Sequence, residues 1–444
     1  MSHKTFRGGV HPEGYKELSK DQPVKQFLPK GDLVFPLNQH IGKPAKPVVK
    51  KGDAVLAGQL IAEADGFVSA NIVSSCSGTV KAIEERHTIS GGRATCIVIA
   101  NDGQFTPAPG IGADRDDTKI TGKEVLDIIK WAGIVGLGGA GFPTHVKLAP
   151  RNPEAIDYVI ANGSECEPYI TCDDQLMRTE SAGIAEGLRL VLRLFPHAKG
   201  VIAIEDNKPE AIAAMEQACS GDANISVLPV MAKYPEGGER NLIGVVTGRQ
   251  LRFGQLPADL GCVVCNVSSL NAIYRAVCKT EPLMSRLFTV SGDAVANPHN
   301  LSVPIGTCCA ELLAAAGGIK PGCDPKKVLC GGPMMGISMS TLDVPTAKNN
   351  NALTILSFDE VELAEEQMTA CIRCGRCGQA CPIGLVPQMM AEAAERCDYE
   401  RYEKKLYGLD CIACGSCTYV CPAKRPLMQL FKHTKAQIMA AKRK

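Results

Sequence analysis

The chain has 444 residues, and at about 150 residues per domain this length predicts roughly three domains. Apolar residues make up 45%, charged residues 21%, and the formal net charge is +1, which excludes both a disordered chain and a dedicated nucleic-acid-binding protein. No apolar stretch reaches the roughly 18–20 residues of a membrane-spanning helix, and the first residues lack the apolar core of a secretory signal, so we expect the protein to lie in the cytoplasm.

Residues 40–90 are predicted to form an all-β domain, because short alternating runs are separated by glycines. The run from Val48 to Gly58 and the later segment 77–80 resemble the sandwiched hairpins of lipoyl- and biotinyl-type domains. Those domains carry their cofactor on a lysine of a turn, but here the turn at residues 69–74 contains no lysine. We therefore expect a structural adaptor, followed by a linker rich in Pro, Gly and Asp over residues 101–118.

The next segment alternates between helix and strand patterns. Thr121 and Glu124 form a capping box that opens a helix. A second capping box, at Asn207 and Glu210, is expected to open a helix that runs to Gly221. Strands are expected at 156–161, 201–204 and 225–230, with another helix at 181–195. Short apolar strands that alternate with helices predict a parallel α/β sheet.

A glycine-rich loop follows the first of these helices. Its pattern is G-x-G-x-x-G, with glycines at Gly136, Gly138, Gly139 and Gly141. The context differs from the usual dinucleotide-binding turn, because a helix precedes the loop and Phe142 and a proline follow it. Glycines still allow the backbone to lie against a ligand and to cradle phosphate with its N–H groups, and Lys147 could add positive charge. The alternative is a packing turn between domains.

Residues 286–336 have the size of a β-grasp-like module. Strands are expected at 287–290 and 328–330, with a helix at 311–316 between them. Residues 342–356 are interpreted as a connection that carries one strand at 353–356.

Eight of the 21 cysteines form two identical runs, C-x2-C-x2-C-x3-C-P. This is the spacing of bacterial two-cluster ferredoxins, in which the fourth cysteine of each run binds the other cluster. One [4Fe–4S] cluster is therefore expected on Cys371, Cys374, Cys377 and Cys421, and the second on Cys411, Cys414, Cys417 and Cys381. Zinc is the alternative, which two complete runs closed by proline disfavour. The pairs Cys262–Cys265 and Cys308–Cys309 are interpreted as small buried apolar side chains.

The segment after Cys421 contains seven Lys or Arg residues and no acidic residue. Its simplest interpretation is a solvated helix end. Binding to an anionic lipid surface or to a partner protein is the alternative.

Several motifs of the central segment together resemble the NADH-oxidising flavoprotein subunit of respiratory complex I. They are the glycine loop with its Phe-Pro-Thr and Lys147, the segment 162–168 (NGSECEP), the turn 234–239 (YPEGGE) and the segment 266–270 (NVSSL). The resemblance implies that Gly136, Gly138, Gly139, Gly141 and Lys147 contact FMN and the nucleotide, and that Phe142 stacks on the adenine. It also implies that Asn162, Ser164 and Glu165 bond the flavin, that Glu167 and Glu239 shape the nicotinamide pocket, and that Asn266 lies near the FMN phosphate. Leu137, Ser164 and Gly238 stand where that family has Arg, Asp and Glu.

The whole chain resembles a narrower family, the C subunits of the Rnf complexes, and the resemblance includes the opening T-F-x-G-G-x-H-P at residues 5–12. It implies an α/β multidomain protein: a lipoyl-like β hairpin sandwich with an N-terminal extension and linker (1–118), a Rossmann-like parallel α/β FMN/NADH-binding flavoprotein core (119–285), a β-grasp (soluble ligand-binding) module and connection (286–356), and a ferredoxin-like two-[4Fe–4S] domain with a basic tail (357–444).

The same resemblance implies a peripheral electron-transfer subunit of a membrane-bound, ion-translocating ferredoxin:NAD+ oxidoreductase. Hydride would pass between NAD(H) and FMN, and single electrons would pass through the two clusters. Its partners would be the other subunits of the complex, ferredoxin and NAD(H), without nucleic acid, at the cytoplasmic face of the cell membrane. The alternatives are a soluble flavin/iron–sulfur reductase such as a cobalamin reductase, which domain order disfavours, and an electron-transfer scaffold with a vestigial flavin site.

Overall fold

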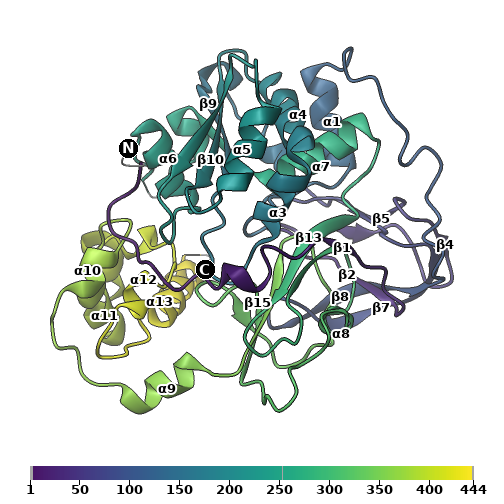
Figure 1. The fold of residues 1–444 in the computed structure, drawn as a ribbon. Helices are drawn as coiled ribbons and strands as arrows, with labels where there is room; N and C mark the ends of the chain where they lie inside the picture. The colour runs from purple at the N-terminus through teal and green to yellow at the C-terminus, as the bar shows by residue number, and fades with distance from the viewer. Residues whose placement is uncertain (1–3, 253, 443–444) are drawn as a thin grey trace.

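The computed structural model describes residues 4–252 and 254–442 (Figure 1). A 3-10 turn, η1 (Lys16–Leu18), precedes a sandwich of two antiparallel sheets, and the buried side chains between the sheets include Phe35, Ile61 and Ile97. One sheet has the order β2 (Leu33–Pro36), β8 (Arg93–Asn101), β7 (Gly78–His87), β4 (Ala54–Val55), and the other has the order β3 (Lys46–Pro47), β5 (Leu60–Glu63), β6 (Ile72–Val73). Strands thus occupy the predicted all-β segment, and no helix or strand is assigned over the described residues 102–121.

A four-stranded parallel sheet forms the next unit, as predicted from the alternating pattern. Its order is β11 (Ile225–Val230), β10 (Lys199–Glu205), β9 (Tyr158–Gly163), β12 (Cys262–Asn266). One face packs on α6 (Glu239–Thr247). The other face packs on α4 (Ser181–Leu192), α5 (Pro209–Ala218) and α7 (Val267–Cys278), with α1 (Gly122–Trp131) and α3 (Cys172–Thr179) beside them. Shorter elements are α2 (Thr144–Lys147), η2 (Pro153–Ala155) and η3 (Pro257–Leu260).

The two predicted capping boxes have different outcomes. The box at Thr121 and Glu124 is present, with both reciprocal hydrogen bonds. The box at Asn207 is wrong: α5 begins at Pro209, its N-cap is Lys208 without a side-chain cap bond, and the helix ends at Ala218. Proline is favoured at the first helical position because its fixed φ suits the helix and its missing N–H is not needed there.

A six-stranded mixed sheet follows, with α8 (Cys309–Ala315) beside it. Its order is β1 (Lys25–Gln26), β14 (His299–Pro304), β13 (Ser285–Ser291), β17 (Ala352–Leu356), β15 (Lys327–Cys330), β16 (Ile337–Ser338). The strand predicted within the connection at residues 342–356 is present as β17, and it is fully buried between β13 and β15. The edge strand β1 comes from the N-terminal extension and pairs with β14.

The C-terminal unit is helical. It contains α10 (Arg376–Ala380), α11 (Pro387–Glu395), a π-helical turn η4 (Arg401–Lys405), η5 (Gly408–Asp410), α12 (Ser416–Tyr419) and α13 (Leu427–Ala441). A helix without buried residues, α9 (Glu360–Gln367), leads into it and stands apart in Figure 1. The basic tail is more than a solvated helix end, because α13 buries Leu427, Phe431 and Ile438. Within residues 4–252 and 254–442, no helix combines the length and apolarity that crossing a membrane would require.

Candidate functional site

The glycine loop lies at the carboxyl ends of two neighbouring strands of the parallel sheet. From β9 the chain adds β10 and β11 on one side, whereas β12 pairs with the opposite side of β9. Ligands of open α/β sheets bind in the crevice at such a switch point. The loop reaches this crevice, since a Cβ atom on Gly138 would lie 2.7 Å from Nδ2 of Asn266, the last residue of β12.

The loop is anchored at both ends and open in the middle. The amide of Gly136 donates to the carbonyl of Phe142 at 2.9 Å, and Phe142 itself is partly buried. Gly141 has a φ of +75°, and a Cβ there would lie 3.1 Å from the carbonyl oxygen of Gln39. A Cβ on Gly139, in contrast, would meet nothing within 4 Å. Backbone N–H groups in such an open glycine segment are available to bind an anion.

The two asparagines at the strand ends are held by hydrogen bonds. Nδ2 of Asn162 donates to the carbonyl of Gly237 at 2.9 Å, and Nδ2 of Asn266 donates to Oδ2 of Asp173 at 2.7 Å. Asp173 is only 5% exposed, and its Oδ1 accepts from the hydroxyl of Ser268 at 2.7 Å. Asp173 therefore organises the end of β12, although the sequence motifs did not single it out.

Lys147 and Glu239 meet at the edge of the same crevice. Lys147 is the last residue of α2, and its Nζ donates to the carbonyl of Val264 at 2.9 Å. Glu239 is the first residue of α6, and one of its carboxylate oxygens lies 3.4 Å from Nζ of Lys147. The Glu239 side chain is 40% exposed, so this pair is open to solvent and to a ligand.

Below the crevice lies a buried ion pair that sequence reasoning missed. Nζ of Lys208 lies 2.7 Å from Oε2 of Glu205, and the two side chains are 5% and 2% exposed. Nζ also donates to the carbonyl of Ser164 at 2.8 Å. Ser164 is fully buried, and its hydroxyl has no partner among the described residues. An unpartnered buried hydroxyl is costly, which suits a group that bonds a bound ligand.

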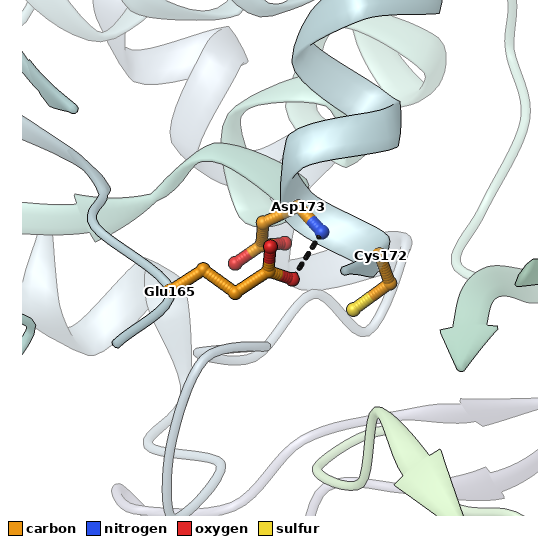
Figure 2. Close-up of side chains that lie close together, drawn as sticks. All are labelled: Glu165, Cys172 and Asp173. Carbon is orange, nitrogen blue, oxygen red and sulfur yellow. Dashed lines mark hydrogen bonds between the residues drawn. The ribbon is translucent and has the colours of Figure 1, made fainter. Parts of the chain in front are cut away.

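Glu165 points at the N-terminus of α3 (Figure 2). Its carboxylate accepts from the amide of Asp173 at 2.6 Å and from that of Asp174 at 3.1 Å. Burial raises the pKa of Glu165 to about 8, against the attraction of Lys16. Glu165, Cys172 and Asp173 lie close enough to hold a metal ion. Their oxygens already accept protein hydrogen bonds, however, so this cluster is interpreted as structural.

Glu167 faces the loop after β15 in the six-stranded sheet. Its Oε1 accepts from the amides of Met334 and Met335 at 2.7 and 2.9 Å. A Cβ atom on Gly332 would overlap Cγ of Glu167, so a glycine is needed at this contact. Burial raises the pKa of Glu167 to about 7. In this arrangement Glu167 joins the α/β core to the six-stranded sheet.

The eight cysteines of the two runs divide between two cavities of the C-terminal unit. Cys371, Cys374, Cys377 and Cys421 line one cavity, and Cys381, Cys411, Cys414 and Cys417 line the other. Each cavity thus receives three cysteines of one run and the last cysteine of the other. Cys371 and Cys374 are exposed, whereas Cys414 is buried. In the two other cysteine pairs, Cys262, Cys265 and Cys309 are buried, and Cys308 is half-buried.

The two runs fold in the same way. Backbone amides donate to three of the sulfurs: Arg373 to Cys371 at 3.4 Å, Ala413 to Cys411 at 3.4 Å, and Leu385 to Cys381 at 3.3 Å. Positive φ angles recur at matching positions of the runs, at Arg373 and Ala413, Gly375 and Gly415, and Gly384 and Lys424. Amides that donate to sulfur stabilise thiolate charge, which is a property of iron–sulfur ligand loops.

The second cavity adjoins the crevice of the α/β core. Tyr234 is 2% exposed, and its hydroxyl donates to the carbonyl of Cys414 at 2.7 Å. Cδ1 of Ile412 would lie 3.8 Å from a Cβ on Gly238, the residue before Glu239. The turn that carries Glu239 thus contacts the loop that carries the cysteines.

Comparisons with known proteins assign families to three segments. Residues 4–104 match the family described as RnfC Barrel sandwich hybrid domain, residues 129–275 match Nuo51 FMN-binding domain, and residues 287–338 match SLBB domain. The solved structures of an NAD+-reducing [NiFe]-hydrogenase in its H2-reduced and air-oxidized states align with TM-scores of 0.48 and 0.49 at 22% identity, over 72% and 71% of this chain and 63% of that chain.

Curated relatives align over most or all of the chain. The C subunit of the proton-translocating ferredoxin:NAD(+) oxidoreductase complex of Clostridium ljungdahlii is 43% identical, over 99% of this chain and 95% of that protein. The C subunit of the Na(+)-translocating ferredoxin:NAD(+) oxidoreductase complex of Acetobacterium woodii is 39% identical, over 100% of this chain and 99% of that protein. The C subunit of the ion-translocating oxidoreductase complex of Rhodobacter capsulatus is 41% identical, over 86% of this chain and 73% of that protein.

Proposed function

This chain belongs to the family of C subunits of the ion-translocating ferredoxin:NAD+ oxidoreductase complexes, and we propose that it is the subunit of such a complex that exchanges hydride between NAD(H) and FMN. The observation that carries the proposal is the open glycine loop at the switch point between β9 and β12. FMN, when bound, supplies the chemistry, because a flavin accepts hydride from NADH and releases electrons singly.

The residues at the crevice fit FMN. The open backbone at Gly139 and the positive charge of Lys147 suit its phosphate. The unpartnered hydroxyl of Ser164 suits a polar edge of the flavin ring. Asn162 and Asn266 would orient the group from the two strand ends, and Glu239, at the exposed edge, would contact the nicotinamide nucleotide.

The two cysteine cavities fit [4Fe–4S] clusters, with the ligand sets expected from the spacing. The two complete runs closed by proline, and their repeated loops with amides that donate to sulfur, suit clusters. The cluster of Cys381, Cys411, Cys414 and Cys417 would be nearer to the flavin, because Tyr234 joins Cys414 to the flavin-site turn. The cluster of Cys371, Cys374, Cys377 and Cys421 would face the redox partner, because two of its cysteines are exposed.

A substitution at Gly139 tests the flavin site. Gly139→Leu places a side chain in open space where the backbone is unstrained, so it should block FMN while the fold remains intact. Gly92→Leu is the matched control, because Gly92 also has an ordinary φ, and a Cβ there would meet only a serine hydroxyl at 4.0 Å. The full chain is reconstituted anaerobically with iron, sulfide and FMN and then titrated with NADH, while absorbance is recorded.

The expected result is that flavin absorbance bleaches before the clusters are reduced, in the wild type and in the Gly92 variant. The Gly139 variant should retain its clusters but bind no FMN. Wild-type protein that retains no FMN after gel filtration, or a Gly139 variant with normal NADH reduction, would refute the proposal.

Attachment to the membrane is proposed to come through the other subunits of the complex, at the cytoplasmic face. Complete release from native membranes by a high-salt wash would contradict this, because screening at about 1 M salt removes lipid-charge binding but spares apolar protein contacts. The coupling ion is proposed to be set elsewhere, because the names of two full-length relatives specify protons and Na(+), respectively.

A further inference from the structure

The N-terminal strap, defined here as residues 4–20, lies against the α/β core and the C-terminal unit (Figure 1). Lys4 forms a parallel bridge with Val230 at the end of β11. Val10 and Tyr234 exchange two backbone hydrogen bonds, at 2.8 and 2.9 Å. The strap therefore pairs with the turn that carries the flavin-site residues.

The glycine pair of the opening motif brings the strap against a cysteine of the second cavity. The amide of Gly9 donates to the carbonyl of Ala380 at 2.9 Å. Gly8 has a φ of +79°, and a Cβ there would lie 2.6 Å from the carbonyl oxygen of Cys381. Any larger residue at Gly8 would force the strap away from this cysteine.

Lys16 is the central contact of the strap with the flavin-site loop, residues 164–170. Its Nζ donates to the carbonyls of Glu165 at 2.8 Å, Glu167 at 2.9 Å and Ile170 at 2.5 Å. An ammonium group has three donors, and all three are used here on one loop. Beside it, the ring of Tyr15 stacks on that of Tyr169, with the ring centroids 4.6 Å apart. The amide of Tyr169 also donates to the carbonyl of Gly14 at 2.8 Å.

The loop requires such support because its backbone is unfavourable. Glu165 and Tyr169 both have positive φ angles, of 46° and 69°. For residues other than glycine, a positive φ costs free energy, and they keep this conformation only when the surrounding structure holds them. Lys16 binds the backbone carbonyl of Glu165 directly, while the carboxylate of the same residue caps α3.

We propose that the strap is a working part of the flavin site, and that Lys16 is the positioning residue that holds Ser164 and Glu165 in place for FMN. The inference rests on the proposed function, because it takes FMN to be the ligand of this loop. A purely structural strap would instead stabilise the fold without a specific effect on the flavin.

The test compares three variants of the full chain, reconstituted with clusters under anaerobic conditions. Lys16→Met removes all three donors, Lys16→Arg keeps donors that can reach carbonyls, and Lys20→Met is the control, because Lys20 lies in the strap with an exposed side chain. FMN affinity is measured by fluorescence titration, the clusters by paramagnetic resonance, and the mobility of residues 164–170 by amide hydrogen exchange.

We expect Lys16→Met to raise the FMN dissociation constant at least about tenfold, which equals about 1.4 kcal/mol of binding free energy. Hydrogen exchange of residues 164–170 should accelerate in this variant, while the cluster signals stay unchanged. Lys16→Arg should recover most of the affinity, and Lys20→Met should match the wild type.

Wild-type FMN affinity in Lys16→Met would overturn the inference, and so would loss of both clusters together with FMN, because that pattern indicates general unfolding. If the wild type itself bound no FMN, the proposed function would fail. Hydrogen exchange would still decide the positioning role, since unchanged exchange of residues 164–170 in Lys16→Met would overturn it without reference to the flavin.

Discussion

Lys208→Met should damage both the stability of the α/β core and its affinity for FMN. The substitution removes the cation that lies 2.7 Å from the buried carboxylate of Glu205, and it removes the donor to the carbonyl of Ser164. Methionine has a similar length, so the main change is electrostatic. Glu205, at 2% exposure, cannot turn towards water without unpacking its surroundings.

The expected magnitude follows from the burial of the pair. Removal of one partner of a buried ion pair costs about 3–5 kcal/mol, because the other charge stays buried without compensation. In a domain of about 150–250 residues, each kcal/mol lowers the unfolding midpoint by about 2–4 °C, so the fall should be about 6–20 °C. The double variant Lys208→Met/Glu205→Gln should recover much of this loss, because it also removes the stranded charge.

The pH dependence has a definite sign. Burial lowers the pKa of Lys208, but the attraction of Glu205 and Glu165 outweighs burial and raises the pKa above 10.5. A cation with a raised pKa in the folded state contributes its stability below its ordinary pKa and loses it only as the pH rises through the raised value. Lys208 itself stays charged from neutral pH to about pH 9, but the carboxyl group of Glu165, whose pKa burial raises to about 8, ionises over this interval. Because Lys208 favours that ionisation, the deficit of Lys208→Met should be larger at about pH 9 than at neutral pH.

The loss of stability is measured by thermal unfolding of the full chain. Flavin release and the hydrogen exchange of β9 and β10 serve as the two signals. Midpoints are compared with the wild type directly, because a chain with several structural units need not unfold in one step. An unfolding midpoint within about 2 °C of the wild type, or a double variant as unstable as the single one, would refute the reasoning.

Three further predictions concern the cysteine cavities and the edge of the crevice. Cys421→Ala should perturb the cluster of the first run and lower the iron content by about half; loss of the second cluster's paramagnetic signal instead would exclude the crossed assignment. Glu239→Gln should raise the NADH concentration needed to bleach the flavin and leave both clusters in place, whereas exposed Glu210→Gln should have no effect; normal NADH titration of the Glu239 variant would place the nucleotide elsewhere. Tyr234→Phe should lower the free energy of unfolding by about 1–3 kcal/mol, because the buried carbonyl of Cys414 loses its donor. The second cluster should then be lost at a lower temperature than in the wild type. If that cluster resisted heat as in the wild type, this hydrogen bond would contribute little.

Sequence patterns predicted those parts of the fold that depend on residues close together in the chain. The capping box at Thr121 forms because its two partners lie three residues apart, and the alternation of short strands and helices correctly indicated a parallel sheet. The box at Asn207 failed because a competing local signal, Pro209, determines where α5 begins. The central place of β17 could not be predicted, because it depends on pairing with β13 and β15, which are distant in the sequence.

The candidate site shows the same division. The glycine loop and the cysteine runs have regular spacings, so the sequence alone could single them out as candidate sites. Lys16 and Asp173 belong to no such pattern, because their roles arise from contacts across more than 90 residues of chain, such as that of Asp173 with Asn266. Glu167 was identified by its motif, but only the fold shows that its carboxylate binds the amides of Met334 and Met335.

The exchange of the last cysteine between the two runs makes the halves of the C-terminal unit interdependent. Neither run can surround its own cavity, since Cys381 lines the cavity of the second run and Cys421 that of the first. A chain interrupted between the runs would leave each half one ligand short. Each proposed cluster should consequently form only after both runs have folded, because its four cysteines come from both of them. A break between the runs should therefore prevent both clusters from forming, whereas the loss of one cysteine should remove only the cluster that it binds.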